Sequence, residues 1–172
     1  MLFRSNDTAT TEIYTLSLHD ALPIFSVHLP LAILLLATLF FLVGFVTKKT
    51  FWENTSRILF LIGALGAWIA IYTGNLADSV VSRKICDPTV LETHETNAYI
   101  VAGLFSVASI LILLDYFGFL KKIERTGKVL ILVLTIAGSG FLVYTGHLGA
   151  TLVYQQAAGV YTPSEDCNEF VD

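Results

Sequence analysis

Residues 29–47 read LPLAILLLATLFFLVGFVT, a run of 19 residues without a charged side chain. A helix needs about 20 apolar residues to cross a hydrocarbon layer of about 30 Å. Three further mainly apolar blocks follow along the chain, at residues 58–77, 98–120 and 129–154. Only helices and closed barrels satisfy their backbone hydrogen bonds in lipid, and runs this long and uniform are not typical of barrel strands. We therefore predict an all-α integral membrane protein with four transmembrane helices.

The composition of the whole chain supports a surface that faces lipid. Charged residues make up 14% of the 172 residues, whereas a soluble domain usually carries about 25%. The formal net charge of −4 excludes a strongly basic protein that binds nucleic acid. The lipid bilayer is therefore the first expected partner, and a larger membrane complex or a second copy of the chain is the next.

The positive residues between the spans predict the direction of each helix. Seven Lys and Arg residues fall in the two loops at residues 48–57 and 121–128, and two fall in the loop at residues 78–97. The tail after Tyr154 has none. Short loops that are rich in Lys and Arg stay in the cytoplasm. We expect both ends of the membrane domain to lie on the external side.

Two stretches of the chain resemble one another. Residues 71–81 read IYTGNLADSVV and residues 143–153 read VYTGHLGATLV, and Gly66 matches Gly138 at the same offset. The Lys-Lys pairs of the two cytoplasmic loops recur at nearly this offset. A tandem duplication of a helical hairpin explains the match, and it predicts an up-down-up-down four-helix bundle. Chance similarity among apolar helices is the alternative.

Residues 1–24 do not follow the pattern of the rest. They are rich in Thr, show no sustained helical or strand period, and have too few apolar residues for a signal-peptide core. The stretch DTATTEIYTLSLHDALPI, residues 7–24, resembles the translation of a sequencing-adapter read. An ordinary polar tail with a short surface helix is the alternative. We expect a non-native or peripheral segment at 1–24, the transmembrane domain at 25–160 and an acidic external tail at 161–172.

Three histidines are expected to gather near the external edge of the bundle. His28 is 20 residues from Lys48, and His147 is 19 residues from Lys128. At 1.5 Å per helical residue, both lie about 28–30 Å from the cytoplasmic edge. His94 precedes the third span by about one turn, on the same side. Ionisable residues at the edge of a span are functional candidates, and we predict one shared site.

The chemistry of such a site has three interpretations. Two axial histidines on different helices would hold haem b for electron transfer. His28, His94 and His147, with Glu92 or Glu95 added, would instead suit a transition metal such as zinc or copper. With no cofactor, the three histidines would wet an interface, bond a carbonyl or cap the third span. No CxxCH motif, Walker loop or GxGxxG motif is present, and no independent catalytic activity is expected.

Two further features lie outside the histidine site. Cys86 and Cys167, the only cysteines, both fall on the predicted external side, where an oxidising environment permits a disulfide. Free thiols are the alternative. Asp115, near the cytoplasmic end of the third span, is expected to reach the interface or to pair with Lys121 or Lys122.

The motifs together resemble one family. They are VHLP (27–30), TGNLA (73–77), LETHETNA (91–98) and GHLGATLVY followed by AAGV (146–160). This combination resembles the bacterial membrane family filed as domain of unknown function 2231, from Phe25 to about Val160. The resemblance implies four helices in a bacterial inner membrane and brings no established activity. Family members often have more residues before the VHLP block, where this chain has the adapter-like segment. A histidine-liganded redox protein and a structural or assembly subunit of a larger complex remain the two leading functions, with a transporter ranked last.

Overall fold

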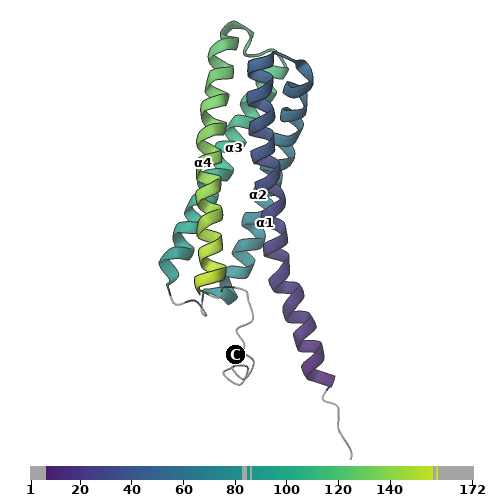
Figure 1. The fold of residues 1–172 in the computed structure, drawn as a ribbon, viewed down its shortest axis with the longest axis vertical. Coiled ribbons are helices and arrows are strands. Elements are labelled where there is room, and N and C mark those ends of the chain that lie inside the picture. The colour runs from purple at the N-terminus through teal and green to yellow at the C-terminus, as the bar shows by residue number, and fades with distance from the viewer. Residues whose placement is uncertain (1–6, 83–84, 86, 157, 159–172) are drawn as a thin grey trace, which may run out of the picture.

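The computed structural model describes residues 7–82, 85, 87–156 and 158 (Figure 1). In this part of the chain each long helix holds a segment apolar enough to cross a membrane, which confirms the four predicted spans. The long helices are α1 (Asp7–Thr47), α2 (Thr50–Val81), α3 (Pro88–Tyr116) and α4 (Glu124–Gln156), and a short 3-10 helix, η1 (Lys121–Ile123), precedes α4.

The helices pack as two neighbouring hairpins, α1 with α2 and α3 with α4 (Figure 1). The two hairpin turns lie at one end of the bundle, which we call the hairpin-turn end; it contains residues 48–49 and 117–123. The end of α2, the start of α3 and the end of α4 lie at the opposite end, which we call the His94 end. The predicted up-down-up-down bundle of helical hairpins is therefore confirmed.

Only two residues, Lys48 and Lys49, separate α1 from α2. Lys48 has a φ of 55°, in the left-handed region. Its N–H donates to the carbonyl of Gly44 at 2.7 Å, which closes the last turn of α1. A Cβ on Gly44 would lie 3.1 Å from Cγ of Glu53. Glycine at this position therefore lets the start of α2 pack directly on the end of α1.

All four helices begin earlier than the apolar blocks predict, and α2 and α3 show how. α2 begins at Thr50 rather than residue 58, and α3 begins at Pro88 rather than residue 98. Asp87 caps α3 by accepting a hydrogen bond from the N–H of Thr89 at 2.9 Å. The hydroxyl and N–H of Thr89 hold the pKa of the Asp87 carboxyl below its usual range. Hydropathy locates the part of a helix that lies in lipid, whereas the start of α3 is fixed by its Asp87 cap. Both helices therefore extend past the predicted spans.

The repeated glycines occupy equivalent positions in the two hairpins. A Cβ on Gly66 of α2 would lie 3.1 Å from Cβ of Pro30 in α1. A Cβ on Gly138 of α4 would lie 3.1 Å from the ring of Phe105 in α3. In a membrane the hydrophobic effect does not drive helices together, so they associate through close packing, which small residues allow. Each matched glycine thus brings the two helices of its own hairpin together.

The core between the hairpins is built from fully buried side chains of all four helices. Leu34, Phe60, Phe105 and Ile131 are each at most 1% exposed. Polar contacts add to the packing between hairpins, because Trp68 of α2 donates to Ser106 of α3 at 3.0 Å. Large apolar residues on the outer faces of the helices are exposed, as expected of a surface that contacts lipid.

Three expectations from the sequence have different outcomes. α1 begins at Asp7 and continues without a break past residue 25, so no helix begins or ends at the expected domain boundary between residues 24 and 25. That boundary stays a prediction. His94 lies within α3 rather than in the loop before it, because the helix begins at Pro88. Cys86, Cys167 and the tail at 161–172 lie outside the described residues.

Candidate functional site at the His94 end

A large cavity of about 520 Å³ lies at the His94 end. Known small-molecule sites usually enclose about 300–1,000 Å³ and are mostly apolar, with a few polar groups. All four helices contribute to the wall, which is formed mainly by Leu, Ile, Val, Ala and Gly side chains. The polar or ionisable lining residues are His28, Asn75, Asp78, His94, Glu95, Thr145 and Tyr154.

His94 of α3 is held in one orientation by α4, the other helix of its hairpin. Its Nδ1 lies 3.0 Å from the carbonyl oxygen of Thr145. A carbonyl can only accept, so Nδ1 carries the proton in this bond, and Nε2 keeps its lone pair in the neutral ring. A Cβ on Gly149 would lie 3.3 Å from Cε1 of His94. Glycine at 149 therefore leaves room for the imidazole against α4.

His28 reaches the same cavity from the opposite hairpin. It lies on α1, and its side chain is exposed at the cavity lining. Pro30, two residues later, packs against Gly66 of α2, and Leu31 lies 3.4 Å from where a Cβ of Gly146 would be. These contacts fix the backbone of α1 against α2 and α4 just beside His28. The cavity therefore brings together imidazoles from α1 and α3.

Comparison with known proteins identifies the family. The chain matches the family of predicted membrane proteins DUF2231 over residues 19–162. The chain belongs to this family. The match extends from within the adapter-like stretch to beyond the end of α4, and it covers the whole cavity. No curated protein and no solved structure matches the chain.

In this DUF2231 protein only some of the predicted site residues lie at the large cavity. His28, His94 and Glu95 line the large cavity, whereas His147 and Glu92 are exposed and do not line it. Among the described residues, no three His, Cys, Asp or Glu side chains are grouped closely enough to hold a metal ion. The predicted five-residue metal set and the pairing of His28 with His147 remain predictions.

Sequence reasoning missed three contributors to the site. Asn75 and Asp78 lie three residues apart on α2 and therefore share one helix face, which was a usable signal. Thr145 contributes through its backbone carbonyl, which no side-chain pattern indicates. Asn75 occupies the position in residues 71–81 that His147 holds in the matching residues 143–153. In the structure it lines the cavity, and its Nδ2 donates to the hydroxyl of Tyr99 at 2.9 Å.

The charges of the lining all have one sign. Asp78 and Glu95 are its carboxyl groups, and no Lys or Arg is among its residues in the described part of the chain. The site therefore suits a ligand that is apolar over most of its surface and is neutral or positive where it meets these two side chains. An imidazole with a fixed Nδ1 proton adds one directional lone pair.

Proposed function

We propose that this DUF2231 protein is a membrane electron-transfer protein that binds haem b in the large cavity, with His94 as an iron ligand. The observation that carries the proposal is the bond between Nδ1 of His94 and the carbonyl of Thr145, at 3.0 Å. Histidines that ligate metals commonly donate their other ring N–H to a carbonyl or carboxylate, which fixes the tautomer and the ring. His94 has this arrangement inside a mainly apolar cavity.

The second axial ligand in this proposal is His28. It lines the same cavity and comes from a different hairpin, so the haem would be held by one histidine from α1 and one from α3. Two histidines on facing helices give a six-coordinate iron, which favours electron transfer over ligand activation. The apolar wall supplies the low-dielectric surroundings that such a cofactor requires, and the protein's role is to hold and orient it.

The acidic lining makes a further distinction. The two propionates of haem would be repelled by Asp78 and Glu95 if they faced these side chains. The proposal therefore places the propionates away from these two residues. Iron protoporphyrin dimethyl ester, which lacks both negative charges, should bind at least as tightly as haem. Much weaker binding of the ester would show that the carboxylates are recognised and that the binding site has a different position.

Reconstitution tests the ligand assignment. Protein purified in detergent and titrated with haemin should give a red-shifted Soret band, and His94→Ala should abolish it because the oriented lone pair is lost. His147→Ala is the matched control, since His147 is exposed and lies outside the cavity lining. His28→Ala should convert a low-spin six-coordinate spectrum to a high-spin one.

The opposite pattern would overturn the assignment. Loss of the Soret band in His147→Ala with retention in His94→Ala would restore the pairing of His28 with His147 and exclude the large cavity as the site. No Soret band in the intact protein would favour a structural or assembly subunit without a cofactor.

The bacterial inner membrane and the orientation of the bundle belong to the same proposal. The chain has nine Lys and Arg residues after residue 25, and seven of them lie at the hairpin-turn end, at residues 48–57 and 121–128. We therefore place this end in the cytoplasm. In a background without cysteines, Glu92→Cys should react with a membrane-impermeant maleimide added to intact cells. Lys122→Cys should react only after the cells are opened. The reverse result would invert the orientation.

A further inference from the structure

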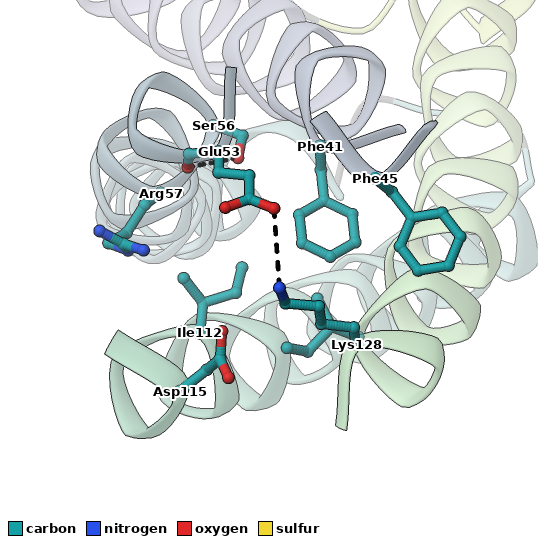
Figure 2. A pocket seen from close by; sticks show the side chains of 9 residues that line it. Phe41, Phe45, Glu53, Ser56, Arg57, Ile112, Asp115 and Lys128 are labelled. Atoms are coloured by element: carbon teal, nitrogen blue, oxygen red, sulfur yellow. Dashed lines mark hydrogen bonds and ion pairs between the residues drawn. The ribbon is translucent and has the colours of Figure 1, made fainter. Parts of the chain in front are cut away.

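A second, small cavity lies at the hairpin-turn end (Figure 2). Its volume is about 20 Å³, and residues of all four long helices line it. Phe41 of α1 contributes to the apolar part of its wall. Four ionisable side chains complete the lining, namely Glu53 and Arg57 of α2, Asp115 of α3 and Lys128 of α4. Asp115 and Lys128 therefore line one cavity, and within the described residues no ion pair joins Asp115 to Lys121 or Lys122.

Arg57, which lines this cavity, carries an unsatisfied donor. Its guanidinium donates from Nη1 to Asn54 at 3.0 Å, and its Cζ lies 4.3 Å from the centre of the Tyr116 ring. Within the part of the chain that the structure describes, its Nε–H is the one buried side-chain polar group without a hydrogen-bond partner. A buried donor that stays unpaired is costly, because it gives up water and gains nothing.

The charges around the cavity balance. Glu53 and Lys128 form an ion pair, drawn as a dashed line in Figure 2, with 3.7 Å between Oε1 and Nζ. Lys128 also pairs with Glu124, at 2.9 Å. Asp115 and Arg57 add one further charge of each sign, although no ion pair joins them in the described residues. A cation in this space would meet Arg57 and Lys128, and an anion would meet Glu53 and Asp115. A neutral molecule that both donates and accepts hydrogen bonds avoids both repulsions.

We propose that the small cavity binds one water molecule, which accepts from Nε–H of Arg57 and donates to a carboxylate of the lining. A cavity holds a water when it offers about 10–15 Å³ or more and two to four polar partners. The volume of about 20 Å³ meets the first condition, and the four ionisable side chains of the lining can supply the polar partners. The water connects Arg57 of the first hairpin to Asp115 of the second. Together with the pair of Glu53 and Lys128, it closes a polar network that joins the hairpins at this end.

Magnetic resonance tests the water directly. In ¹⁵N-labelled protein in lipid nanodiscs, the Nε–H signal of Arg57, assigned by its loss in Arg57→Lys, should show a cross-peak to a long-lived water. Its proton should also exchange with bulk solvent at least about tenfold more slowly than that of Arg125, the exposed control. Absence of the water cross-peak, or exchange as fast as that of Arg125, would overturn the proposal.

A double-mutant cycle tests the connection between the hairpins. Arg57→Leu and Asp115→Leu should each lower Tm by about 4 °C or more, because each leaves buried partners unpaired. The double variant should be no less stable than either single variant, since the leucines remove both ends of the water bridge and fill the space. The cycle of Arg57→Leu with Arg125→Leu should be additive. Additive effects in the first cycle would contradict a shared water.

Discussion

Replacing Phe105 with Ala is expected to lower the free energy of unfolding by about 3 kcal/mol. Phe105 is 0% exposed, and its ring centroid lies 6.0 Å from that of Phe60. The same ring fills the space that Gly138 leaves on α4. In a bilayer, packing rather than exclusion from water holds helices together, so the cavity left by the ring is the main loss. The free energy of unfolding is measured in mixed detergent micelles by raising the fraction of dodecyl sulfate until the protein unfolds.

Phe141→Ala is the matched control for this substitution. Phe141 lies on α4 and is 40% exposed, so its ring contacts lipid in both the folded bundle and the separated helices. Its loss should change the free energy of unfolding by less than about 1 kcal/mol. Equal effects of the two substitutions would mean that Phe105 faces lipid and that the hairpins pack through other faces.

Replacing Gly74 with Leu is expected to weaken ligand binding in the large cavity at least about 100-fold, or about 2.8 kcal/mol. Gly74 lines this cavity, and a Cβ built on it meets no atom within 4 Å. A leucine can therefore extend into the cavity without displacing the backbone, and it should occupy the space that haem would need. Haemin titration of the purified variant measures the affinity, and its thermal unfolding should stay close to that of the parent protein.

Gly140→Leu is the control for this second prediction. A Cβ on Gly140 also meets nothing within 4 Å, but Gly140 lies outside the cavity lining. Gly140→Leu should leave the affinity for haemin unchanged. It also shows any general effect of replacing a transmembrane glycine with leucine. Unchanged affinity in Gly74→Leu would show that the ligand binds elsewhere.

The sequence by itself determined the number of helices, their pairing into hairpins and the family. These depend on properties visible along the chain: about 20 apolar residues fix a span, and the match between residues 71–81 and 143–153 indicates two equivalent hairpins. That the first turn has only two residues, 48–49, was visible only in the structure. The sequence also determined depth, because the rise along a helix is constant. The rise predicted one level for His28 and His147, and the position of His94 just before the third span predicted the same end for it. His28 and His94 both line the large cavity at that end.

Only the tertiary structure decided which way each side chain points. A helix turns by about 100° per residue, so positions two residues apart, at nearly one depth, face roughly opposite sides, and packing against other helices selects which side faces inward. His94 faces Thr145 and the large cavity, whereas His147, two residues after Thr145, is exposed. Asp115 likewise joins Lys128 at the small cavity because α3 packs beside α4. The repeated glycines set those rotations, since each one determines which face of its helix approaches its partner most closely.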